Sequence, residues 1–149
     1  MGLLSSIRIS ASALAAQRLR MDVVANNVAN MNSTRGLDGG PFRRQVVSLR
    51  EMPDSRSAFT ALLNRSSALG QPRKGVAINR IETDMSPGRR SFDPSNPDAD
   101  EDGFVELSNV NLVVEMTDMV AATRSYEASI TVLNAAKTMA LRALDIARR

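Results

Sequence analysis

The stretch that decides the fold is NVNLVVEMTDMVAATRSYEASITVLNAAKTMALRALDI, residues 109–146. It contains no proline or glycine, and one row of residues recurs in it with alternating spacings of four and three. That row is Leu112, Met116, Met119, Thr123, Tyr126, Ile130, Leu133, Lys137, Ala140, Leu144 and Ala147. A second row, which includes Val113, Val120 and Met139, lies beside it. The spacing predicts one amphipathic helix over 110–147, about 57 Å long, with a wide apolar face.

The N-terminal end shows the same kind of pattern. Ile7, Leu14, Met21 and Val28 repeat every seven residues, which is close to a coiled-coil seam. We therefore predict a helix over residues 3–30, about 42 Å long. Together the two ends predict an antiparallel, coiled-coil-like pair of helices.

The first helix runs into NNVAN, residues 26–30, where asparagines are poor helix formers. One interpretation is helix termination, because Asn tolerates the left-handed conformation and its amide can cover freed carbonyls. The other is that Asn26, Asn27 and Asn30 form hydrogen bonds across subunits and so fix their register. The two interpretations are compatible.

The middle of the chain is rich in turns. All six prolines lie between residues 41 and 97, and seven of the eight glycines lie between 36 and 103. Short strand-like pieces occur at 42–50, 75–82 and 103–107, and we predict a loop over 54–70. The predicted fold class is α+β, with an N-terminal helix and junction (1–35), a small β-rich insert (36–108) and a C-terminal helix (109–149).

Composition limits the possible functions. The 149 residues include no Cys and no His, so disulfides, thiolate metal sites and the commonest acid–base side chain are absent. No glycine-rich phosphate loop and no nucleophile with a base partner is evident, so we predict neither an enzyme nor a cofactor. The net charge is only +3 and aromatic residues make up 3% of the chain, which argues against a nucleic-acid partner. We also expect no signal peptide and no membrane-spanning segment.

The wide apolar faces of the two ends need a partner. We predict that they are buried against other chains, because a monomer avoids exposing such a surface. Burial within one chain and binding to a membrane surface are the alternatives. The predicted subunit interface consists of Ile7, Leu14, Met21, Asn26, Asn27, Val28, Asn30, Arg43, Arg44, Leu112, Met116, Met119, Tyr126, Ile130, Leu133 and Leu144.

Two charged motifs allow sharper hypotheses. DADEDG, residues 98–103, resembles the start of an EF-hand loop, but Asn109 stands where the bidentate Glu belongs, so an exposed acidic turn is the preferred interpretation. The pair Arg43 and Arg44 is predicted either to contact an acidic patch of a neighbouring subunit, such as the turn at 98–102, or to protect an exposed edge strand.

Several motifs carry a family resemblance. NNVANMNST after an amphipathic helix resembles the N-terminal motif of the flagellar axial proteins, which build the rod and hook of the bacterial flagellum. GGPFRRQVV (39–47), FDPSNPDADEDGFVEL (92–107) and the stretch 109–146 resemble, in particular, subunits of the proximal rod. Residues 51–74 carry no such likeness.

The resemblance implies a structural subunit that is exported unfolded through the flagellar type III apparatus to the periplasm. It would join copies of itself and other rod proteins in a helical tube that transmits torque and encloses the export channel. It also implies terminal helices that are disordered in the free monomer. The alternative is a cytoplasmic helical adaptor or export-chaperone-like protein, which we would expect to be acidic and folded throughout.

Overall fold

The computed structural model describes residues 3–36, 39–52 and 75–147. Its helices are α1 (Leu3–Ala29) and α3 (Leu112–Ala147), and its strands are β1 (Gln45–Glu51), β2 (Val76–Thr83), β3 (Arg90–Phe92) and β4 (Phe104–Glu106). Both predicted helices and the α+β class are confirmed, and strand β3 is an addition. The predicted loop over 54–70 lies outside the described residues, and the division at 35/36 and 108/109 remains a prediction.

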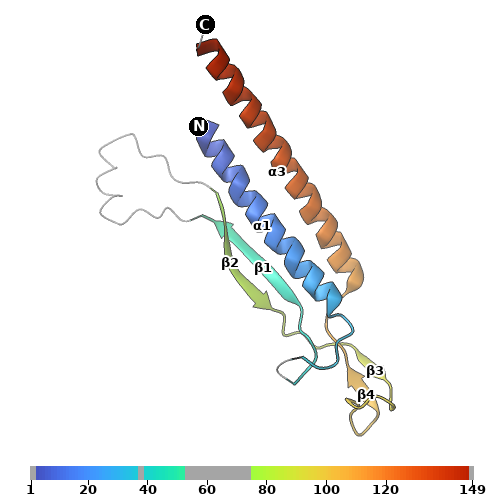
Figure 1. The fold of residues 1–149 in the computed structure, drawn as a ribbon. Coiled ribbons are helices and arrows are strands. Elements are labelled where there is room, and N and C mark those ends of the chain that lie inside the picture. Colours follow the sequence, from blue (N-terminus) through green and yellow to red (C-terminus); the bar gives the residue numbers. More distant parts are fainter. Residues whose placement is uncertain (1–2, 37–38, 53–74, 148–149) are drawn as a thin grey trace, which may run out of the picture.

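Helices α1 and α3 lie side by side and run in opposite directions (Figure 1). Small residues dominate their contact: Ala16 on α1 and both Ala122 and Ala136 on α3 are buried. Small side chains let two helix backbones approach closely. Helix α3 has 36 residues and α1 has 27, so α3 continues past the first residue of α1, and residues 141–146 are all exposed.

Strands β1 and β2 form an antiparallel hairpin on the side of α1 that faces away from α3 (Figure 1). Their register runs from Gln45 opposite Thr83 to Glu51 opposite Val76, with one irregularity after Ser48. The hairpin is tied to the helix where the backbone N–H of Val76 donates to the hydroxyl of Ser12, at 3.1 Å. Helix α1 is therefore the middle layer of three.

Strands β3 and β4 form a second, smaller hairpin near the end of α1 and the start of α3 (Figure 1). Phe92 and Phe104 pack edge to face across it, with ring centroids 5.3 Å apart. Gly103 has a φ of 76°, a left-handed conformation that suits glycine in the turn before β4. Neither described helix carries an apolar stretch that is long enough to cross a bilayer.

Candidate functional site

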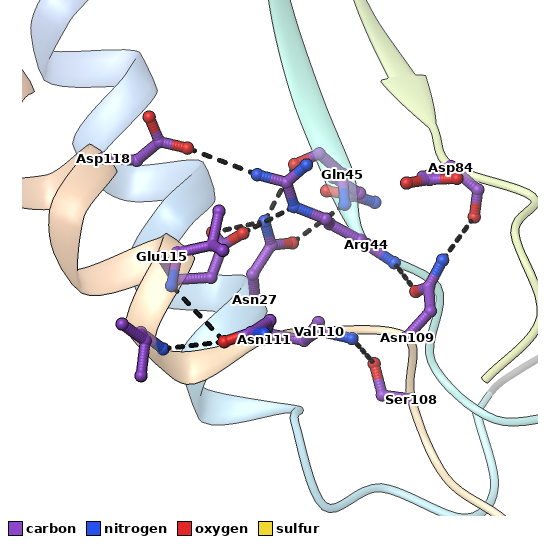
Figure 2. Close-up of polar contacts among 12 residues, drawn as sticks. Asn27, Arg44, Gln45, Asp84, Ser108, Asn109, Val110, Asn111, Glu115 and Asp118 are labelled. Atoms are coloured by element: carbon purple, nitrogen blue, oxygen red, sulfur yellow. Dashed lines mark hydrogen bonds and ion pairs between the residues drawn. The ribbon is translucent and has the colours of Figure 1, made fainter. Parts of the chain in front are cut away.

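The centre of the candidate site is Asn27, in the last turn of α1. Its side chain is fully buried, and both N–H donors and the oxygen of its amide form hydrogen bonds. The amide nitrogen donates to the carbonyl of Gln45 (2.8 Å) and to Oε2 of Glu115 (3.0 Å), while its oxygen accepts from the N–H of Gln45 (2.9 Å) (Figure 2). The Asn27 amide thus takes the place of a neighbouring strand at the first residue of β1 and fixes β1 to α1.

Glu115 is the second member of this cluster and lies in the first turn of α3. Its side chain is fully buried, a position that a carboxylate occupies only with a partner charge and hydrogen bonds. Arg44 supplies the charge, with its Nε 2.6 Å from Oε1 of Glu115. The N-terminus of a helix also favours a carboxylate, and Asn111 caps this one by accepting from the N–H of Val113 at 3.0 Å.

A second ion pair extends the cluster along the two helices. Asp118 accepts from the guanidinium groups of both Arg20 (2.9 Å) and Arg44 (3.2 Å). Two cations therefore face two carboxylates between α1, β1 and α3. A cavity of about 40 Å³ adjoins them, which is large enough for a water molecule. We call Arg20, Asn27, Arg44, Gln45, Glu115 and Asp118 the polar junction.

The segment ahead of α3 is joined to the same region. The N–H of Arg44 donates to the side chain of Asn109 (2.7 Å), and the Asn109 amide donates to the carbonyl of Asp84 (3.0 Å). Hydrogen bonds from the backbone and the hydroxyl of Ser86 lower the pKa of Asp84 below its ordinary value of 3.8. These bonds fix where α3 begins relative to both β1 and the residues after β2.

The structure separates the three asparagines of NNVAN. Asn27 is fully buried and its amide bonds to Gln45 and Glu115 of its own chain, so it has an internal role, and its predicted contact across subunits stays a prediction. The Asn30 amide donates to the carbonyl of Asn26 at 2.9 Å, but that carbonyl also accepts from the Asn30 backbone N–H (3.2 Å), so the amide adds a second bond and does not cover a freed carbonyl. The left-handed conformation predicted for this helix end is wrong, because no described residue other than glycine has a positive φ. Contacts of Asn26 and Asn30 between subunits stay a prediction.

The two predicted arginines are also engaged inside the chain. Arg43 donates to Glu106 (3.0 Å) and to the carbonyl of Ser86 (2.8 Å), while Arg44 belongs to the polar junction. Their predicted contact with an acidic turn of a neighbouring subunit stays a prediction. Both side chains are largely covered, so the alternative of two exposed edge-strand charges is wrong.

The acidic turn has its own internal partners. Asp98 accepts from the hydroxyl of Thr34 (2.8 Å) and pairs with Arg35 (3.4 Å), and Asp100 pairs with Arg90 (2.9 Å). The two carboxylates thus bind different arginines. Across residues 3–36, 39–52 and 75–147, no three His, Cys, Asp or Glu side chains converge as a metal site.

The predicted apolar interface divides into covered and uncovered residues. Ile7, Leu14, Met21 and Val28 on α1 and Met119, Tyr126 and Leu133 on α3 are partly buried within the chain, whereas Leu112, Met116, Ile130 and Leu144 count as exposed. The opposite side of α3 faces solvent with Val113 (72% exposed), Met116 (58%) and Val120 (52%). We call the exposed residues Val113, Met116, Val120, Val132, Met139 and Ile146 the outer face of α3.

Comparisons with known proteins assign this architecture to a class of proteins. The family model for flagella basal body rod proteins matches residues 7–36, and the model for the C-terminal part of flagellar basal body rod FlgEFG proteins matches residues 101–146. A pair of end helices around an insert, with rod-protein models matching both ends, defines a flagellar axial subunit.

Full-length relatives narrow the class. The flagellar basal-body rod protein FlgC of Bacillus subtilis is 44% identical over 148 residues, which cover 96% of this chain and 97% of that protein. FlgC of Borreliella burgdorferi is 44% identical and FlgC of Salmonella typhimurium 37%, each over 98% of both chains. The chain belongs to the FlgC family of flagellar basal-body rod proteins. Of the two predicted functions, the comparisons support the structural rod subunit.

Sequence reasoning missed the acidic half of the polar junction. Glu115 lies between Val114 and Met116 on α3, and helical spacing places it on the same side as Ala122 and Tyr126. The available signal was a pair of carboxylates, Glu115 and Asp118, spaced by three residues near the packed side of the helix. The partner, Arg44, became visible only once β1 was placed beside the start of α3.

Proposed function

We propose that this structural subunit polymerises with copies of itself and with other rod proteins into a helical tube that encloses the export channel and transmits motor torque. The observation that carries the proposal is the outer face of α3, which the single chain leaves uncovered. Several exposed apolar residues gathered on one side of a helix are typical of an interaction site. A partner chain that covers it would complete the packing of the helix.

The polar junction suits a part that bears torque. It ties α1, β1 and α3 at one end of the molecule through a buried carboxylate, two arginines and the buried amide of Asn27. Sliding α3 along α1 by one turn would leave the buried charge of Glu115 without Arg44, which is strongly unfavourable. The junction thus holds the angle and register at which the helices meet the insert.

The far end of α3 supports contacts along the tube. Beyond the first residue of α1, the exposed apolar residues Leu141, Leu144 and Ile146 point in different directions around the helix. No element of the described chain covers them. We propose that this projecting segment enters the packing of neighbouring subunits above or below.

The fold is also consistent with passage through the flagellar type III apparatus to a periplasmic rod. The buried apolar residues of the described chain are all Ala or Val: Ala16, Val23, Val24, Val105, Val110, Ala122 and Ala136. Small side chains remove little area from water, and the stabilisation from burial scales with that area. Such a core keeps the free energy of unfolding of the free chain moderate, and covering the outer face of α3 on assembly adds to the stability of the end helices.

A deletion strain tests the proposal. In a strain from which the gene for this chain has been deleted, the chain expressed from a plasmid should restore swarming and appear in purified basal bodies. Val120→Asp places a charge on the outer face of α3 and should abolish both, whereas Ser125→Asp, at another exposed position of α3, should keep both. A wild-type chain that restores swarming but is absent from basal bodies would refute the proposed function.

A further inference from the structure

The side of α1 that faces solvent carries an ordered charge pattern. Arg18, Asp22, Ala25 and Ala29 are exposed, and their spacings of four, three and four place them on one side of the helix. Neither Arg18 nor Asp22 has a hydrogen bond or ion pair with any described residue. This side of α1 thus presents a cation, an anion and then two small residues toward the C-terminal end of the helix.

The outer face of α3 carries a matching pattern. Arg124 and Glu127 follow Val120 with spacings of four and three, and both are exposed. These two side chains also lack a partner among the described residues. Reading from the start of α3, the order is apolar, cation, anion.

The two patterns are complementary when the helices run in opposite directions. In that arrangement Asp22 faces Arg124, and Arg18 faces Glu127. The same register brings Ala25 opposite Val120 and Ala29 opposite Met116. A parallel arrangement would instead place like charges together, which is unfavourable.

We propose that α1 of one copy of this chain packs, through its solvent-facing side, against the outer face of α3 of the next copy in the rod. The ion pairs Asp22–Arg124 and Arg18–Glu127 between the two copies set the register. Val120 and Met116 of one copy lie against Ala25 and Ala29 of the other. The identity of the neighbour as a second copy in the rod rests on the proposed function.

The geometry of the chain supports a second copy as the partner that covers the outer face of α3. Copies that point the same way along a tube bring α1 of one beside α3 of the next in the antiparallel sense that the charges require. Within one chain Asn27 is level with Glu115 and Met21 contacts Thr123, so the proposed register differs by about two residues, or about 3 Å along the axis. The two surfaces are different patches, and such a heterologous contact continues into a helical assembly if it does not close into a ring.

Each part of the contact has a separate role. Exposed ion pairs contribute little affinity, so these charges select the register and the partner. Affinity comes from covering Val113, Met116 and Val120, which face solvent in the single chain. Ala25 and Ala29 allow the two helices to approach closely.

Disulfide cross-linking tests the contact directly, because the chain has no cysteine of its own. The double variant Ala25→Cys with Val120→Cys, oxidised in purified basal bodies, should give dimers and a ladder of larger species. The control Ala25→Cys with Met139→Cys has both thiols exposed but far out of register, and it should give no ladder. A control ladder equal to that of the first pair would overturn the proposal.

Charge exchange gives an independent test. Asp22→Arg and Arg124→Asp should each cause a loss of swarming, and the double variant should regain it, since the pair is restored with its signs reversed. Single variants that swarm normally, or a double variant no better than the weaker single, would overturn the contact. If the contact is overturned in this way, wild-type chain found in purified basal bodies would show that the proposed function still holds. Absence of the wild-type chain from basal bodies would overturn both the contact and the proposed function.

Discussion

Asn27→Ala tests the polar junction most sharply, because it deletes three hydrogen bonds and changes no charge. The variant removes the bonds to the carbonyl and N–H of Gln45 and to Oε2 of Glu115. The matched control is Asn26→Ala, which concerns the same residue type one position earlier. Asn26 is exposed, and its side chain bonds only to the Asn30 amide.

The expected loss can be worked from these contacts. A neutral hydrogen bond contributes about 0.5–1.5 kcal/mol and a bond to a charged group about 1.5–3 kcal/mol. Two bonds of the first kind and one of the second give a loss of about 2.5–6 kcal/mol in the free energy of unfolding. With a urea m-value of about 2 kcal/mol/M, the unfolding midpoint falls by about 1–3 M. Asn26→Ala should change the free energy by less than about 0.5 kcal/mol.

Equilibrium urea unfolding of the purified full chain, followed by circular dichroism at the helix band, measures this difference. Hydrogen exchange adds a local readout, since the N–H of Gln45 is protected by the Asn27 side chain and should exchange much faster in Asn27→Ala. Equal midpoints for Asn27→Ala and Asn26→Ala, with unchanged exchange at Gln45, would refute the reasoning.

Two further predictions concern the helix contact and the segment after β2. Ala122 is fully buried in the α1–α3 contact, and Ala122→Leu forces extra carbons into it. The variant should lower the free energy of unfolding by about 1–3 kcal/mol, measured by thermal unfolding. The control Ala121→Leu, at an exposed position, should have little effect. In an NMR titration Asp84 should ionise with a pKa below 3.8, and Ser86→Ala should raise that pKa, because one of the hydrogen bonds to the carboxylate is lost. Because the folded pKa is the lower one, the stabilisation from Asp84 is complete above its unfolded pKa and is lost as the pH falls through the folded pKa.

Periodicity predicted the helices well because helical spacing is a local property. The rows from Leu112 and from Ile7 placed both helices to within two residues at each end. The same rows did not reveal which side of α3 would pack against α1. Ala122 and Ala136 are buried on the side of α3 that packs against α1, yet alanine is a weak hydrophobic signal and did not mark that side.

For the polar residues, the sequence indicated which side chains matter but not which partners they bind. Asn27, Arg43 and Arg44 were recognised as important, but their partners were assigned to other chains. Those partners, Gln45, Glu106 and Glu115, are between 18 and 88 residues away in the sequence. Which of these partners binds Asn27, Arg43 or Arg44 depends on how β1 is placed against α1 and α3. Local spacing in the sequence does not contain that information.

The central claim is that a neighbouring chain covers the outer face of α3. The reactivity of a thiol introduced on that face tests this claim directly. Val120→Cys should react rapidly with a maleimide in the free chain and become protected in purified basal bodies. Ala122→Cys, on the buried side of the same helix, gives the reference for a thiol covered within one chain. A Val120→Cys thiol that reacts equally fast in the free chain and in the assembled basal body would contradict the account.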